Sequence, residues 1–467
     1  MPKCLILMIK FLCTLAFLLL FVNISSAQNC HCQDEFLFLK AFMEKNYVGF
    51  GDKVGPDTRP RYDSLSAVVS RRAAAEMKPV YCLGLMKEWL GFFRDGHNYI
   101  DISPGKLFSP DSAEVIRLSP RALAILGERR KGIEGVYHTA DSTYRIALLK
   151  SKTKDRDYAG VILSSRAPTW KRGQVKLELK QIDATQFLAS AYLRDHRPDA
   201  ENFTFDGESF SGGGWIRDGV PARKTVQQQW PAVQARRISD KTFYIGVGSF
   251  DESNTVAVDS LFHANDSILR TTPNLILDLR GNRGGSDFVY DPITPWIYSG
   301  PVSVQGVAVL ATEDNVKGWM ALLDEKDIPE PSKQYLRRVI SQMQGQAGQL
   351  VDIAGDGTVT LPEVRPFPQK VVILVNGDCA SSAEQFILEA IQSRKVTLMG
   401  QPTAGVLDYA NVRVAAFPCL PFALNYATTR SRRVDMGKGI DNVGIKPDIV
   451  LTIDKDWVAE AREFLEK

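Results

Sequence analysis

The chain has 467 residues, which is long enough for two or three domains and a sizeable core. Its content of 44% hydrophobic and 24% charged residues is typical of a globular protein. A formal net charge of +3, spread along the chain, does not indicate a nucleic-acid partner.

Residues 1–27 have the pattern of a secretory signal peptide. An apolar run from Phe11 to Val22 follows two lysines and precedes small residues that end at Ala27. The run is short for a spanning helix, which needs about 20 apolar residues. We therefore expect cleavage after Ala27 rather than an uncleaved membrane anchor, with no stable membrane span afterwards. The mature protein is then exported: periplasmic, in the cell envelope or secreted.

Export changes what the cysteines predict. Five cysteines lie beyond the signal peptide, and thiols in an oxidising compartment commonly pair. We expect one disulfide from Cys82 to Cys30 or Cys32 and another between Cys379 and Cys419; the alternative is free thiols in a core. The triplet CHC at 30–32 has no second ligand cluster, so we expect no zinc site, and the sequence indicates no other metal or cofactor.

Three regions follow the signal peptide. Residues 28–115 place apolar side chains three and four apart, which predicts a helical domain. Residues 116–235 hold short apolar runs with polar, Gly or Pro separators, which predicts a small antiparallel β domain, a barrel or a sandwich. Residues 236–467 alternate apolar strands with helices, which predicts an α/β core.

Two turns in the third region carry the chemistry. NLILDLRGNRGG at 274–285 is an apolar strand that ends in a glycine-rich turn, a backbone that binds phosphate or an oxyanion. No Lys-Ser or Lys-Thr follows, which argues against a P-loop, and a plain tight turn is the alternative. NGDCASSAEQF at 376–386 sets Ser381 and Ser382 between a strand and a helix. Either serine is a candidate nucleophile, or it only caps the helix.

A nucleophilic serine needs a base. His97 stands out among the five histidines because GFFRDGHNYI places it just after a predicted helix. The alternative is a histidine that only complements the dipole of that helix. A carboxylate usually orients such a base, and the spacing alone does not select one.

Together these motifs resemble a known family. DLRGNRGG, the serine turn followed by AEQF, TAG and GIDNVGIKPDI occur in an order similar to that of the C-terminal processing peptidases, also called tail-specific proteases, and of the tricorn core group. The resemblance covers residues from about 240 to 452 and implies a crotonase-like α/β core acting on protein or peptide substrates. It implies Ser381 as the nucleophile and the N–H groups of Gly285 and Ser382 as oxyanion donors.

The sequence departs from the processing peptidases at the residue that serves as the catalytic base. The position that carries the lysine of the processing peptidases is Val406 here, within TAGVLDYA. The tricorn-type arrangement uses a histidine and an acid instead, and the matching positions are His97 and Asp441. The sequence thus predicts a Ser381–His97–Asp441 triad. The alternative is a member that has lost catalysis and binds apolar ligands or peptides, as the family also includes such proteins. The oligomeric state is not predicted.

A last motif resembles a calcium loop. DIAGDGTVTLPE at 352–363 has acids at several positions of an EF-hand, but Ala354 offers no side-chain oxygen and Pro362 precedes the final Glu. We expect a turn without calcium.

Overall fold

We describe a computed structural model of the chain. It describes residues 30–76, 78–102, 113–129, 131–153, 156–210, 214–220, 232–325, 328 and 330–467. The predicted signal peptide lies outside these residues. Within them, no helix has the length and apolar character needed to cross a bilayer.

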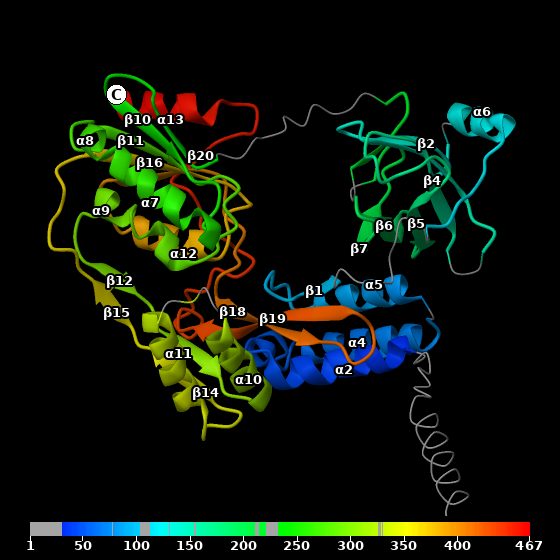
Figure 1. Cartoon of the computed structure of the whole chain (residues 1–467), viewed down its shortest axis with the longest axis horizontal. Helices are drawn as coiled ribbons and strands as arrows, with labels where there is room; N and C mark the ends of the chain where they lie inside the picture. Colours follow the sequence, from blue (N-terminus) through cyan, green and yellow to red (C-terminus); the bar gives the residue numbers. More distant parts are fainter. Residues whose placement is uncertain are drawn as a thin grey trace, which may run out of the picture.

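The N-terminal region is helical, as its periodicity predicts. Its helices are α2 (Cys32–Asn46), α3 (Phe50–Lys53), α4 (Arg59–Ala74) and α5 (Pro79–Leu90). They enclose an aromatic core in which Tyr62 and Trp89 are fully buried. In Figure 1, α2 and α4 lie below a long hairpin from the C-terminal half of the chain, and α5 lies above it.

Two disulfides involve this region, one within it and one that links it to the C-terminal part of the chain. Cys32 pairs with Cys82 inside it, which confirms one prediction. Cys30 pairs with Cys419, so the predicted bond between Cys379 and Cys419 is wrong. Cys379 is instead a buried free thiol that donates to the Leu279 carbonyl oxygen at 3.1 Å.

An antiparallel β domain comes next. After α6 (Pro120–Glu128) its strands run in the spatial order β7-β6-β5-β4-β3-β2-β8, so the domain is one seven-stranded sheet rather than a two-sheet sandwich. The bounds are β2 (Gly135–Thr139), β3 (Tyr144–Lys150), β4 (Tyr158–Ser165), β5 (Val175–Gln181), β6 (Gln186–Tyr192), β7 (Pro198–Thr204) and β8 (Trp215–Arg217).

The β domain meets the helical region along α5. Gly84 of α5 lies so close to Leu188 that a Cβ on the glycine would approach that side chain to 2.7 Å. Tyr81 donates to the buried carboxylate of Glu178 at 3.0 Å, and Lys87 pairs with Asp199 at 2.5 Å. The contact is therefore partly apolar and partly ionic.

The α/β core has a six-stranded sheet in the order β20-β17-β16-β11-β10-β9. All neighbours pair in parallel except β9 with β10, because each parallel strand is followed by a crossover. The bounds are β9 (Gln234–Arg237), β10 (Thr242–Gly246), β11 (Asn274–Asp278), β16 (Lys370–Val375), β17 (Val396–Gly400) and β20 (Ile449–Val450).

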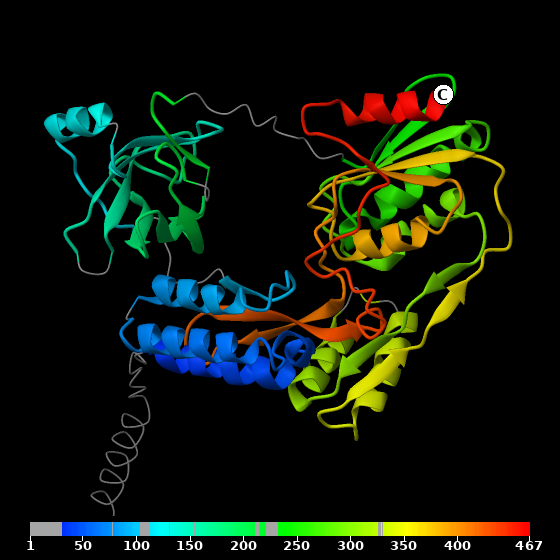
Figure 2. The ribbon, with the colours of Figure 1, turned by 180° about the vertical axis from the view of Figure 1, so that it is seen from behind.

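Helices cover both faces of this sheet (Figure 2). On one face Ile276 and Val372 pack against α13 (Trp457–Glu466); on the other Leu275 and Ile373 pack against α7 (Thr255–Ala264) and α12 (Ser382–Ala390). Short elements on the second side are η2 (Glu252–Asn254), α8 (Asp266–Leu269), η3 (Asp287–Tyr290) and α9 (Thr294–Ile297). The near-continuous apolar runs of the strands follow from this burial on both faces.

A second sheet combines one strand from the N-terminal region with four strands from the C-terminal half of the chain. Its strands are β1 (Tyr99–Ile102), β13 (Val307–Leu310), β14 (Leu350–Ala354), β18 (Tyr409–Ala416) and β19 (Phe422–Ser431), with α10 (Glu313–Ala321), η4 (Leu322–Asp324) and α11 (Glu330–Met343) packed beside it. A ribbon of β12 (Val302–Val304) and β15 (Gly357–Val359) links it to the core.

β1 pairs antiparallel with β19, with Tyr99 opposite Asn425. This pairing brings the segment around His97 next to the C-terminal half of the chain. The calcium-loop motif at 352–363 runs from within β14 through β15 into the segment after it, and its first acid, Asp352, pairs with Arg432.

Candidate active site

Ser381 occupies the sharp turn between β16 and α12. Its φ of 55° and ψ of −125° fall where a residue with a Cβ is rarely found. Strain of this kind at a strand-to-helix turn exposes the hydroxyl of a nucleophile. The Ser381 side chain caps no N–H of α12, so the capping role that the sequence left open does not apply to it.

Ser382 is engaged differently. It is the first residue of α12, it is buried, and its hydroxyl donates to the Gly285 carbonyl oxygen at 2.9 Å. That bond ties the nucleophile turn to the glycine-rich turn. The geometry thus distinguishes the two serines that the sequence presented as alternatives.

His97 reaches Ser381 from the other end of the chain. Its Nε2 lies 3.3 Å from Ser381 Oγ, within reach of a proton transfer. The backbone N–H of His97 donates to Asp95 Oδ1 at 2.9 Å, which fixes the loop after α5. The structure therefore brings together two of the three residues predicted to form a triad.

Two carboxylates lie behind the imidazole. Asp95 Oδ1 is 3.6 Å from His97 Nδ1, and Asp95 Oδ2 accepts from the Tyr47 hydroxyl at 2.8 Å. Asp441, the acid that the sequence predicted, pairs through Oδ2 with Lys53 and accepts from Asn442 at 2.7 Å. Within the described chain, His97 Nδ1 and Asp441 Oδ1 are both buried without a hydrogen-bond partner.

Burial raises the pKa of Asp441 to about 6, although Lys53 favours the charged form. The nearby negative charges of Asp95 and Asp408 raise this pKa further. Buried Asp95 and half-buried Asp441 and Lys53 form an ionic cluster, in which Lys53 is the cation that offsets Asp441.

The glycine-rich turn lies against the nucleophile turn. A Cβ at Gly284 would come within 2.8 Å of Ser381 Cβ, so the approach requires glycine. Asn282 holds this turn by accepting from the N–H groups of Gly284 and Phe250 at 2.9 and 3.2 Å. In the described part of the chain the N–H groups of Gly285 and Ser382 donate to no other residue.

Glu384 fixes the other side of the turn. Its fully buried carboxylate accepts from the N–H groups of Gly405 and Val406 at 2.8 and 2.7 Å and from the Thr403 hydroxyl. Val406 in turn accepts the Ser381 N–H at 2.9 Å. Burial raises the pKa of Glu384, and these hydrogen bonds oppose that rise.

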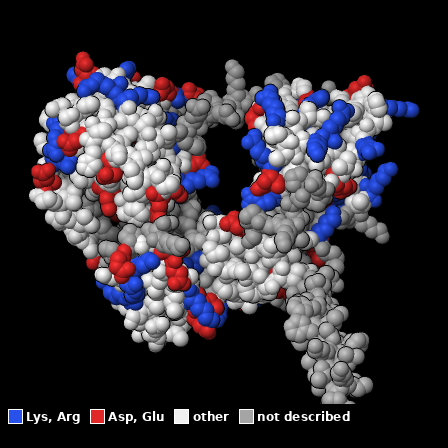
Figure 3. Space-filling view, in the orientation of Figure 1, with Lys and Arg blue, Asp and Glu red and all other residues white. Residues whose placement is uncertain are grey.

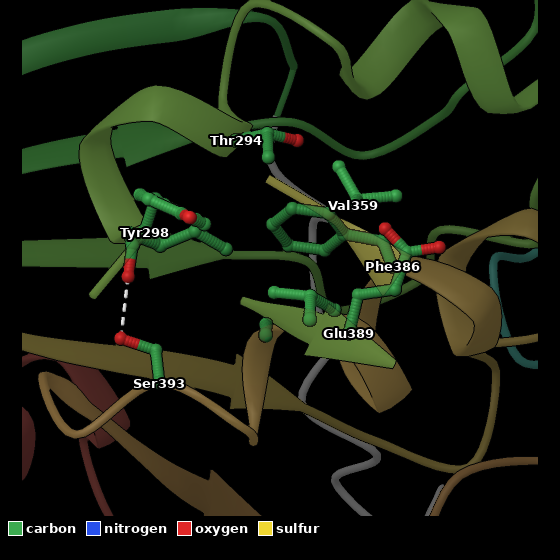
Figure 4. A pocket seen from close by; sticks show the side chains of 9 residues that line it. Thr294, Tyr298, Val359, Phe386, Glu389 and Ser393 are labelled. Carbon is green, nitrogen blue, oxygen red and sulfur yellow. Dashed lines mark hydrogen bonds between the residues drawn. The ribbon is translucent and has the colours of Figure 1, made fainter. Parts of the chain in front are cut away.

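Two cavities near the site differ in size. One, along α12, measures about 20 Å³, room for one water, and is lined by Phe386, Glu389 and Tyr298 among others (Figure 4). The other is an open groove of about 370 Å³ between the 87–99 segment and residues 404–406, which we call the 87–99 groove. The molecule is deeply hollowed between the core and the β domain (Figure 3), and α5, which contributes to the groove, borders this hollow (Figure 1).

Comparison with known proteins identifies the family. The model of peptidase family S41 matches residues 241–451, the segment that holds both turns and Asp441. The chain belongs to the S41 peptidases. It is a serine-type peptidase that acts on protein or peptide substrates, and the predicted membership of the C-terminal processing peptidases is confirmed. A search of the curated proteins finds no match.

Solved structures resemble this S41 peptidase along nearly its whole length. A mutant of CPAF is 12% identical, with a TM-score of 0.51 over 94% of this chain and 96% of that one. Mature CPAF complexed with lactacystin is 14% identical, with a TM-score of 0.49 over 93% and 97%. The photosystem II D1 C-terminal processing protease is 12% identical, with a TM-score of 0.38 over 93% and 97%. At these identities the similarity to the CPAF mutant concerns the fold alone.

Sequence reasoning missed three residues of this S41 peptidase. Asp95 contacts His97, Lys53 contacts Asp441, and Glu384 contacts the 403–406 loop. Asp95 stands in the motif DGH and Glu384 in the motif AEQF, whereas Lys53 had no local signal. Val406, where the resemblance implied a lysine, lies against the loop of His97: its methyl groups are 3.1 Å from where a Cβ on Gly96 would stand.

Proposed function

We propose that the protein is an exported serine peptidase in which Ser381 is the nucleophile and His97 the general base. The observation that carries this proposal is the 3.3 Å distance between His97 Nε2 and Ser381 Oγ at a strained turn. Nothing in the geometry favours the alternative of a lapsed, ligand-binding member, because the histidine lies within reach of the serine.

Each step of peptide hydrolysis then has a chemical group of the protein that carries it out. His97 Nε2 takes the Ser381 proton as Oγ attacks the peptide carbonyl carbon. The carbonyl oxygen becomes an oxyanion between the N–H groups of Gly285 and Ser382, which have no other partner among the described residues. His97 gives the proton to the leaving amine, and a water activated by the same imidazole releases the acyl group.

Either of two acids can orient His97. We propose Asp95 as the carboxylate facing Nδ1, supported by its 3.6 Å separation. Asp441, the acid of the predicted triad, then acts from behind Asp95 and is held by its ion pair with Lys53. The proposal includes a crotonase-like core, supported by the parallel sheet with helices on both faces. Export to an oxidising compartment is supported by the two disulfides.

Labelling of residues 28–467 with a fluorophosphonate probe tests the nucleophile and the base. We expect an adduct on Ser381, mapped by mass spectrometry, and a labelling rate at least about 10³-fold lower in His97→Ala. Ser382→Ala is the matched control and should keep the adduct on Ser381. An adduct on Ser382, or an unchanged rate in His97→Ala, would refute the assignment.

Peptide hydrolysis by variants of the two acids separates their roles. Asp95→Asn should lower kcat by about 10²–10⁴-fold, since it removes the charge that stabilises the imidazolium. Asp441→Asn should cost about tenfold or less, because Lys53 already offsets its charge. The reverse order of effects would return Asp441 to the triad. Circular dichroism of both variants checks that each is folded.

A further inference from the structure

Arg94 lies on the 87–99 groove, three residues before His97. It is exposed, and its backbone has a φ of 49°, the left-handed region that favours glycine or asparagine. Holding an arginine in this conformation costs about 1 kcal/mol or more. The strain therefore raises the question of what the guanidinium does there.

No acid of the described chain pairs with Arg94, unlike the other charged groups of the groove. Lys87 pairs with Asp199, and Asp95 turns its carboxylate to Tyr47 and the His97 backbone. An arginine that served only to fix the loop would be expected to contact a partner in it. Arg94 instead offers a free planar fork of N–H donors to whatever enters the groove.

The groove is placed to receive the substrate chain. Val406 lines it and also accepts the Ser381 N–H, so one wall of the groove adjoins the nucleophile turn, while Ser381 and His97 themselves lie outside the lining. Its lining is otherwise largely apolar, with Leu90, Tyr99 and Ala404. A volume of about 370 Å³ falls in the range that holds a ligand, whereas the cavity along α12 holds only a water.

We propose that Arg94 binds a carboxylate of the peptide substrate in the 87–99 groove, so that the enzyme prefers acidic peptides. This rests on the proposed function of Ser381. The carboxylate belongs to an Asp or Glu side chain near the scissile bond, which offers the two oxygens that a guanidinium binds bidentately.

The experiment compares matched fluorogenic peptides. One set carries Glu or Gln in turn at each of the four positions on either side of one scissile bond. The other carries a free or an amidated C-terminus. We expect kcat/KM to be about five- to tenfold higher for the acidic member of one pair, mainly through KM. A preference that occurs only between the free and the amidated C-terminus would refute the binding of a side-chain carboxylate.

Substitutions attribute the preference to Arg94. Arg94→Gln should bring the ratio of the decisive pair close to one, and Arg94→Glu should favour a Lys-containing peptide. Arg283→Gln is the matched control, because Arg283 is an exposed arginine near the site but outside the groove and should leave the preference unchanged. Arg94→Gly, which relieves the strained backbone, should lose the preference as Arg94→Gln does.

Two different failures are distinguishable. If the wild type cleaves both members of every pair equally, or if Arg94→Gln keeps the preference, the role of Arg94 is refuted while Ser381 remains the nucleophile. If no peptide is cleaved and the fluorophosphonate labels no serine, the proposed function fails first and the inference fails with it.

Discussion

A single buried carboxylate, that of Glu384, holds the loop on which Ser381 rests. Glu384→Gln keeps the shape but points an amide N–H₂ at backbone N–H groups that need an acceptor. We expect the variant to lose about 1–3 kcal/mol of unfolding free energy. Its kcat should fall because Val406 no longer fixes the strained Ser381. Thermal unfolding and peptide hydrolysis measure the two effects.

Glu389→Gln provides the comparison on the same helix. Glu389 is half-buried and accepts from the side chains of Gln385 and Tyr290, with no contact to the 403–406 loop. Its substitution should leave kcat within about twofold of the wild type. Equal losses of kcat in the two variants would show that Glu384 has no special part in holding the serine.

Single residues also show how far sequence reasoning reaches. Ser381 and His97 stood out because a serine between strand and helix and a histidine after a helix are local patterns. The contacts of Asp95, Asp441 and Lys53 were not predictable, because three separate segments meet behind His97. The free thiol of Cys379 was not predictable either, because the sequence shows five cysteines beyond the signal peptide but not which of them stays unpaired.

Among the elements, the β18–β19 hairpin connects parts of the chain that lie far apart in the sequence. It pairs with β1 on one strand and carries Cys419, which binds Cys30 near the N-terminus. Strand and helix positions followed from apolar periodicity, but this pairing across more than half of the chain leaves no periodic trace. The sequence therefore predicts the helical, β and α/β regions better than the contacts that hold these regions together.

Removing the Cys30–Cys419 bond tests how much the contact between the N-terminal region and the β18–β19 hairpin depends on it. The bond closes a loop with a sequence separation of 389 residues. We expect the double variant Cys30→Ser, Cys419→Ser to lose about 2–5 kcal/mol of unfolding free energy because the unfolded chain gains freedom. Urea unfolding measures the loss. An unchanged midpoint would mean that the hairpin is held without the bond.

Thiol counting checks the pairing itself. Burial raises the pKa of Cys379 to about 12, so its reactive thiolate is scarce at neutral pH. The native protein without its signal peptide (residues 28–467) should show no thiol that reacts with an aromatic disulfide reagent, and the same protein, unfolded but not reduced, should show one. Two or more reactive thiols after unfolding without reductant would contradict the two disulfides.

At the scale of the whole molecule, Asp441 couples folding to pH. Its pKa is about 6 in the folded protein and about 3.9 in an unfolded chain, so between these values the folded state binds more protons. Its contribution to stability is complete below about pH 4 and is lost as the pH rises through 6, by about 3 kcal/mol in total. This is opposite in sign to an ordinary ion-paired carboxylate.

Asp441→Asn should remove this component. The variant leaves Lys53 without its partner, which lowers stability at every pH, so the slope between pH 4 and 7 is the decisive quantity rather than the absolute value. Urea titrations across that range should show stability falling less steeply, or rising more steeply, with pH than in the wild type. Lys53→Met should move the Asp441 titration to higher pH, because it removes the cation that favours the charged form. Equal slopes in the wild type and Asp441→Asn would show that the proton is held elsewhere, and the cluster behind His97 would then have another charge distribution.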